Sequence, residues 1–132
     1  MKKKIKTKIT FIIRTKNEER WVGHAIQSIL DRVYRPEILI VDNNSTDKTL
    51  KIVKYFMHDP QLKDESDHPS GKNYTDLKIL KIKDYTPGAA LNYGIKNSSN
   101  DIVVIMSAHC VLKKFNFEKI SNDLKNFACI FG

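Results

Sequence analysis

Two polar clusters follow apolar runs in this sequence, and they carry the side chains best suited to chemistry. Ser107 and His109 come directly after the apolar run 102–106, and the cluster 42–47 comes directly after the run 38–41. In open parallel α/β sheets, ligands collect at the carboxyl ends of the strands. A hydroxyl, an imidazole and a carboxylate in such a crevice predict a binding or catalytic site.

The elements that would position these side chains alternate along the chain. Strand-like runs occur at 8–14, 37–41, 77–82 and 101–106, and helical spacing of apolar residues occurs at 21–30, 50–56 and 115–127, with a further helix predicted from 87. The continuous apolar run at 102–106 predicts a strand buried on both faces. Strands that alternate with helices predict the α/β class, with a mostly parallel sheet and flanking helices.

Local signals set the expected boundaries. Asn17 is a suitable cap for the first helix, and Pro87 suits the first turn of the third. The polar segment 59–75 has no periodicity and predicts a long surface loop, whereas residues 128–131 look like the opening of a further strand. The chain of 132 residues is therefore expected to be one domain, 1–132.

Composition narrows the class of protein. A hydrophobic content of 41% fits an ordinary globular chain, and no apolar run reaches membrane-spanning length. The amino terminus shows no cleavable signal pattern, so a cytoplasmic location is expected. Cys110 and Cys129 have neither paired spacing nor a neighbouring ligand cluster, which argues against a disulfide framework and a structural zinc site.

The formal net charge of +8 allows nucleic acid, an anionic membrane surface or an anionic small substrate as partners. Lysines are concentrated in the first eight residues, which favours a solvated tail, with attraction to an anionic lipid surface as the alternative. Basic patches interleaved with aromatic residues are not evident, so specific nucleic-acid binding is not predicted.

Three segments, 11–19, 40–49 and 87–94, together and in this order resemble glycosyltransferase family 2, which has the GT-A nucleotide-sugar fold. The second segment matches the family most specifically, because it contains the run Val-Asp-Asn-Asn-Ser-Thr-Asp. The resemblance covers nearly the whole chain but only the amino-terminal, donor-binding half of a typical family member. It implies a Rossmann-like fold and a nucleotide-activated sugar as the partner.

The resemblance also implies site residues. The end of the first strand would line the nucleotide base, the end of the second would contact the base or ribose, and the later helix start would complete the pocket. The implied nucleotide-binding residues are Arg14, Thr15, Lys16, Asn17, Glu18, Asp42, Asn43, Asn92, Ser107 and His109. Asp42 could instead only cap the next helix, and Asp47 is assigned mainly to loop structure. The catalytic base is expected in the following half, so no catalytic residue is predicted.

Ser107 and His109 lie where the family usually carries Asp-x-Asp, which holds a divalent metal against the diphosphate. Two readings of this departure stay open. His109 could bind Mn²⁺ or Mg²⁺, with Ser107 as a weak oxygen ligand. Alternatively, His109 as a cation could contact the phosphate directly.

Two functions follow. The first is a glycosyltransferase donor domain that serves a glycan or a lipid-linked acceptor at the inner face of the membrane, with doubtful activity alone. The second is a non-catalytic nucleotide-binding or self-associating module, for which an unfinished sheet edge predicts a homodimer. A signalling domain with Asp42 as phosphoacceptor has little support, because the first strand does not end in acidic residues.

Overall fold

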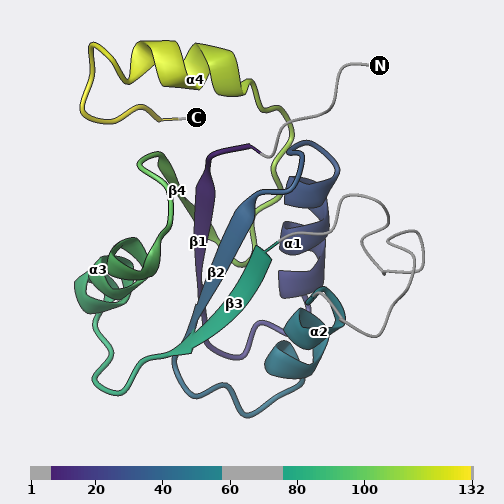
Figure 1. The fold of residues 1–132 in the computed structure, drawn as a ribbon. Helices are drawn as coiled ribbons and strands as arrows, with labels where there is room; N and C mark the ends of the chain where they lie inside the picture. The colour runs from purple at the N-terminus through teal and green to yellow at the C-terminus, as the bar shows by residue number, and fades with distance from the viewer. Residues whose placement is uncertain (1–6, 58–75, 132) are drawn as a thin grey trace.

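The computed structural model describes residues 7–57 and 76–131, which form an α/β fold around one sheet (Figure 1). Four parallel strands lie in the order β3-β2-β1-β4. The elements are β1 (Thr10–Thr15), α1 (Val22–Leu30), β2 (Glu37–Asp42), α2 (Thr49–Tyr55), β3 (Asp76–Lys81), α3 (Pro87–Asn97), β4 (Val103–Ser107) and α4 (Phe117–Asp123). The predicted α/β class with a parallel sheet is confirmed. The predicted loop at 59–75 lies outside the described residues.

Helices cover both faces of the central strands (Figure 1). Phe11 and Ile13 of β1 point to the face covered by α1 and α2, where they join a large buried cluster with Ile26. Ile12 points to the opposite face, where it packs in a smaller cluster with Ala90 of α3. Burial on both sides explains why β1 and β2 are continuous apolar runs and not alternating ones.

The strand order places a crevice between β1 and β4. From β1 the chain adds β2 and then β3 on one side, and it later returns to add β4 on the other side of β1. The connections on the two sides of such a reversal leave room for a ligand at the carboxyl ends of the strands. The register pairs Arg14 with Ser107 and Thr15 with Asp42, so these four side chains end their strands at the same edge.

Strand β4 is an edge strand and is less buried than predicted. None of its five residues is fully buried, and Ile105 is 53% exposed. The expectation of a strand buried on both faces is therefore wrong. The physical reason is that α3 packs mainly on β1 and β2, so Ile105 stays largely exposed on the α3 side of β4, whereas Val103 is half-buried against the smaller cluster. Val104 and Met106 still pack against the larger cluster on the other face.

The predicted helix starts have different outcomes. Helix α3 begins at Pro87, as predicted, and its cap residue Thr86 accepts a hydrogen bond on Oγ1 from Ala89 N at 3.0 Å. The prediction that Asn17 caps the first helix is wrong. Helix α1 begins at Val22, five residues after Asn17, and no side chain caps it. The side chain of Asn17 is used elsewhere, as described below.

The carboxyl-terminal segment also differs from the prediction. Helix α4 ends at Asp123 and is shorter than the expected helix at 115–127, and none of its residues is buried. Its cap is Asn116, which accepts a hydrogen bond from Lys119 N at 3.0 Å. The strand expected at 128–131 is wrong, because these exposed residues pair with no strand of the sheet that the structure describes. Without a partner strand, extended backbone groups bond to water instead.

A buried carboxylate holds the opposite, amino-terminal edge of the sheet. Glu37 is 1% exposed, and its Oε1 accepts hydrogen bonds from Thr10 Oγ1 and Ser99 N, each at 2.8 Å. Its Oε2 accepts from Ser99 Oγ at 2.8 Å and lies 3.9 Å from Lys78 Nζ. Burial raises the pKa of Glu37, but the hydrogen bonds from Ser99 and Thr10 and the charge of Lys78 outweigh it and bring the pKa below 4.5. One side chain thus joins β1, β2, β3 and the connection before β4.

We expect Glu37→Ala to lower the free energy of unfolding by about 1 to 3 kcal/mol, because buried donors lose their acceptor. Glu37→Gln should cost less, since it keeps the shape and one acceptor oxygen. The depressed pKa means that the ionised carboxylate stabilises the fold above about pH 4.5 and that this contribution is lost as the pH falls through the lower folded-state pKa. Urea unfolding followed between pH 7 and pH 3 measures both effects.

Asp101→Asn is the matched control, because Asp101 is exposed and lies just before β4. It should leave the pH dependence of stability close to that of the wild type. If Glu37→Gln and the wild type lose stability equally below pH 4.5, the acid sensitivity does not come from Glu37.

Candidate functional site

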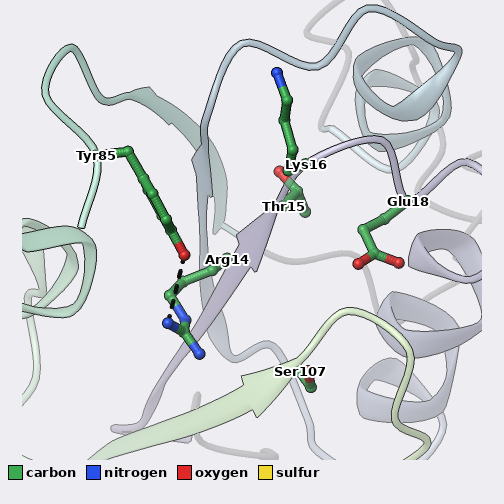
Figure 2. A pocket seen from close by; sticks show the side chains of 6 residues that line it. All are labelled: Arg14, Thr15, Lys16, Glu18, Tyr85 and Ser107. Atoms are coloured by element: carbon green, nitrogen blue, oxygen red, sulfur yellow. Dashed lines mark hydrogen bonds between the residues drawn. The ribbon is translucent and has the colours of Figure 1, made fainter. Parts of the chain in front are cut away.

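A pocket lies at the carboxyl ends of β1 and β4, where the strand order reverses (Figure 2). Its volume is about 160 Å³. The residues that line it are Arg14, Thr15, Lys16, Glu18, Tyr85 and Ser107. All but Tyr85 belong to the set that the sequence predicted for nucleotide binding. The pocket therefore brings together residues from β1, the loop after it, the connection before α3 and the end of β4.

Tyr85 is the lining residue that sequence reasoning missed. It lies in the connection between β3 and α3, and its hydroxyl accepts a hydrogen bond from Arg14 Nη1 at 3.5 Å (Figure 2). The residue predicted from this region was Asn92, which lies on α3, is exposed, and is not among the residues that line the pocket. The available signal was an aromatic side chain in the polar turn directly after a strand.

Asp42 does not line the pocket but bonds to Thr15, which does. It is 0% exposed, and its Oδ1 accepts a hydrogen bond from Thr15 Oγ1 at 2.7 Å and another from Ser45 Oγ at 2.5 Å. Its Oδ2 accepts from Ser45 N at 3.0 Å. Asn43 joins the same strand ends through its backbone, since Asn43 N donates to the Thr15 carbonyl at 2.9 Å. The carboxylate is thus committed to three protein donors that lock β1 to β2 and to the following loop.

Asn17 holds the loop after β1 against the loop after β2. Its φ of 53° is in the left-handed region, which asparagine tolerates better than most residues. Its Oδ1 accepts hydrogen bonds from Thr46 N at 2.8 Å and Asp47 N at 3.4 Å, while its own N donates to Ser45 Oγ at 3.0 Å. The side chain of Asn17 therefore faces the neighbouring loop.

The loop contacts continue for two more residues. Glu18 N donates to Thr49 Oγ1 at 2.7 Å, and Glu19 N donates to Asp47 Oδ2 at 3.2 Å. Asp47 Oδ1 also accepts from Thr49 N at 2.8 Å, in line with its predicted role in the loop. Burial raises the pKa of Asp47, but the hydrogen bonds from Thr49 and the Glu19 backbone outweigh it and lower the pKa below 3.8. The two loops thus act as one unit beneath the pocket.

His109 lies beside the pocket and contacts two of its lining residues. Its Nε2 is 3.4 Å from Ser107 Oγ, and its Nδ1 is 3.7 Å from Glu18 Oε1. These side chains fit a divalent metal poorly, because Mg²⁺ and Mn²⁺ prefer several carboxylate or carbonyl oxygens. Within residues 7–57 and 76–131, no group of three His, Cys, Asp or Glu side chains could hold a metal. Ser107 and His109 as metal ligands stay a prediction.

Known proteins resemble this chain in sequence. The sequence model of Glycosyl transferase family 2 matches residues 10–130. A dolichyl N-acetyl-alpha-D-glucosaminyl phosphate 3-beta-D-2,3-diacetamido-2,3-dideoxy-beta-D-glucuronosyltransferase of Methanococcus voltae is 34% identical over 104 residues, which is 76% of this chain and 29% of the relative. A poly-beta-1,6-N-acetyl-D-glucosamine synthase of Staphylococcus epidermidis is 29% identical over 105 residues, which is 79% of this chain and 22% of the relative. The chain thus spans less than a third of the length of these relatives.

Solved structures share the fold. S. aureus TarS 1-349 in complex with UDP has a TM-score of 0.68 at 20% identity, with 90% of this chain and 32% of that chain covered. The mannosyltransferase PcManGT from Pyrobaculum calidifontis, in complex with GDP-Man and Mn²⁺, has a TM-score of 0.65 at 22% identity, with 92% and 32% covered. The likeness extends over nearly all of this chain, so the arrangement of strands and helices is one found in GT-A glycosyltransferases.

We expect Thr15→Val to lower the free energy of unfolding by about 1.5 to 3 kcal/mol, because it removes a hydrogen bond to a buried carboxylate and keeps the side-chain shape. Thr15→Ser keeps the hydroxyl and should cost about 1 kcal/mol or less, for the lost methyl group. Chemical denaturation of both variants, and of Asp42→Asn with and without Thr15→Val, measures the coupling between Thr15 and Asp42. Fully additive effects would show that the two side chains do not stabilise each other.

Proposed function

This chain belongs to glycosyl transferase family 2, and we propose that it is the nucleotide-sugar-binding part of a glycosyltransferase. The proposed reaction moves a sugar from a nucleotide-activated donor to an acceptor hydroxyl. The observation that carries the proposal is the pocket at the reversal of strand order, lined by the cations Arg14 and Lys16 and by three hydroxyl groups. Such side chains suit the phosphates and ribose of a nucleotide. The non-catalytic module is not favoured, because the relatives named above are transferases and a synthase.

The donor site is proposed to use the residues singled out in the sequence. These are Arg14, Thr15, Lys16, Asn17, Glu18, Asp42, Asn43, Asn92, Ser107 and His109. Their positions support direct contact for the residues that line the pocket and for His109 beside them. Asp42 and Asn17 are already bonded to protein groups, which supports a role in holding the loops under the donor. Tyr85 joins the proposed site as an aromatic wall.

The chemistry needs a base and an acceptor pocket in addition to the donor. The acceptor oxygen would attack the anomeric carbon and give its proton to a base, while the nucleotide leaves with the electron pair of the broken bond. We assign no base in this chain. The relatives are several times longer, and the base and the acceptor pocket are proposed to come from such additional sequence.

The acceptor is proposed to be a glycan or a lipid-linked sugar. Support comes from the relatives, of which one is a poly-N-acetylglucosamine synthase and another carries a dolichyl phosphate substrate in its name. A cytoplasmic location, with peripheral attraction to an anionic membrane, would fit the lysines of the first eight residues. In the described parts of the chain, no helix has the length and apolar character needed to cross a bilayer.

The donor diphosphate can be held in two ways. In one, Mn²⁺ or Mg²⁺ bound by His109 and Ser107 would offset the phosphate charge, and the structural neighbour with GDP-Man and Mn²⁺ supports this choice. In the other, protein cations contact the phosphates directly. The poor metal donor set at this place supports the second way.

The free edge of β4 supports the proposed homodimer. Ile105 is 53% exposed on this edge strand, and Val111 just beyond it is 54% exposed. An unpaired strand edge with exposed apolar residues commonly associates with another chain.

We expect the chain to sediment as a dimer and Ile105→Lys to shift it towards the monomer, because a lysine on an edge strand opposes edge-to-edge pairing. Ile95→Lys is the matched control, since Ile95 is 48% exposed but lies on α3. Analytical ultracentrifugation of the three proteins at high concentration measures the shift. A wild-type protein that sediments with the mass of a monomer would contradict the proposed homodimer.

The test of the donor site is calorimetric titration of the chain with UDP, GDP, CDP and CMP, each with Mn²⁺ and with EDTA. We expect one of these nucleotides to bind, and Tyr85→Ala to weaken its binding roughly tenfold through the loss of an aromatic contact. Tyr55→Ala is the control, because Tyr55 is 69% exposed on α2 and is not part of the pocket. A folded chain that binds none of the four would contradict the proposed function.

A further inference from the structure

The two cations that line the pocket have no acidic partner in the described ranges 7–57 and 76–131. Neither Arg14 nor Lys16 lies within ion-pair distance of a carboxylate there. Arg14 Nη1 donates to the Tyr85 hydroxyl at 3.5 Å, and Lys16 Nζ donates to the carbonyl oxygen of Asn44 at 2.7 Å. Both acceptors are neutral oxygens. Arg14 and Lys16 outnumber Glu18, the one acidic residue that lines the pocket, so the pocket attracts an anion.

The position of Arg14 on β1 affects whether a metal ion can bind at the end of the neighbouring strand β4. Arg14 stands in register with Ser107, and the two side chains line the same pocket (Figure 2). The permanent positive charge of Arg14 in this pocket disfavours a metal cation at Ser107 and His109, where Glu18 is the one carboxylate among the lining residues.

We propose that Arg14, helped by Lys16 and His109, binds the diphosphate of the donor directly, and that donor binding does not require a divalent metal. The inference rests on the proposed function and specifies how that site holds its ligand. A planar guanidinium can donate two parallel hydrogen bonds to phosphate oxygens. The pocket volume of about 160 Å³ is smaller than that of a typical small-molecule site and leaves room for phosphate groups beside Arg14.

The positions of Glu18 and Ser107 beside His109 support direct binding of the diphosphate by Arg14. Glu18 is the acidic lining residue, and its Oε1 faces His109 Nδ1 at 3.7 Å. The acidic group therefore lies on the His109 side of the pocket, and Arg14 has no carboxylate within ion-pair distance in the described parts of the chain. Ser107 Oγ, 3.4 Å from His109 Nε2, adds a hydroxyl donor from β4.

The experiment compares nucleoside diphosphates, monophosphates and inorganic pyrophosphate on the 132-residue chain by calorimetry, in EDTA and in Mn²⁺. We expect UDP or GDP to bind in EDTA with an affinity within about threefold of that in Mn²⁺, because the protein supplies the charge that a metal would otherwise supply. Pyrophosphate should compete for the site in EDTA. This comparison needs no variant and therefore does not depend on how a substitution affects folding.

Variants then test the assigned residue. Arg14→Gln should weaken diphosphate binding in EDTA by about tenfold or more, and Arg14→Lys by less, since lysine keeps the charge without the paired hydrogen bonds. The affinity for the monophosphate should fall less than that for the diphosphate. Arg20→Gln is the matched control, because Arg20 is exposed and outside the pocket. Circular dichroism melting verifies that each variant is folded.

The outcomes separate the two proposals. A nucleotide that binds only with Mn²⁺, or that binds Arg14→Gln as tightly as the wild type, would overturn the direct role of Arg14 and leave the proposed function standing. A folded wild-type chain that binds no nucleotide in either buffer would overturn the proposed function and this inference with it.

Discussion

Two threonine-to-carboxylate hydrogen bonds fix the register of the central strands, and the site depends on that register. Strand β1 begins with Thr10 and ends with Thr15, and β2 begins with Glu37 and ends with Asp42. Each threonine donates to its register partner, at 2.8 Å at the amino end and 2.7 Å at the carboxyl end. A slip by one residue would break both bonds and turn every apolar side chain to the wrong face. Each carboxylate is buried and is offset by additional donors, which is the condition under which such burial is tolerated.

The Thr15–Asp42 hydrogen bond lies at the carboxyl ends of β1 and β2, the same edge of the sheet as the pocket. From Asp42, hydrogen bonds run through Ser45 to Asn17 and from there to Thr46, and Glu18 N bonds to Thr49 at the start of α2, so the two loops form one framework. A framework whose polar groups already have partners loses little conformational freedom when a ligand arrives. The most family-like residues of the sequence are therefore largely structural. They hold Arg14 and Lys16 at the rim, where side chains with fewer protein partners can meet a ligand.

The fold was largely predictable because each central strand is an apolar run of strand length that ends in turn-forming residues. The positions of Ser107 at a strand end and of Pro87 at a helix start followed from the same local signals. The errors concern properties set by neighbours distant in sequence. Ile105 is exposed because of which strands α3 covers, and Asn17 serves a second loop and not its own helix. Tyr85 could not be placed in the pocket until β3 and β1 were known to lie in one sheet.

In the proposed binding mode, the residue at position 107 influences how Arg14 meets a ligand, because the two are register partners that line one pocket. A carboxylate there, on the strand beside Arg14 and in register with it, would lie in the same pocket and pair with the guanidinium. That pair would direct Arg14 to the protein and give the pocket an acidic group for a metal. Ser107 carries no charge, and within the described residues 7–57 and 76–131 the side-chain hydrogen bond of Arg14 goes to the neutral Tyr85 hydroxyl. Under the proposed binding mode, a neutral strand end would therefore affect two features together, because Ser107 offers no carboxylate to a metal and leaves the guanidinium to the phosphate.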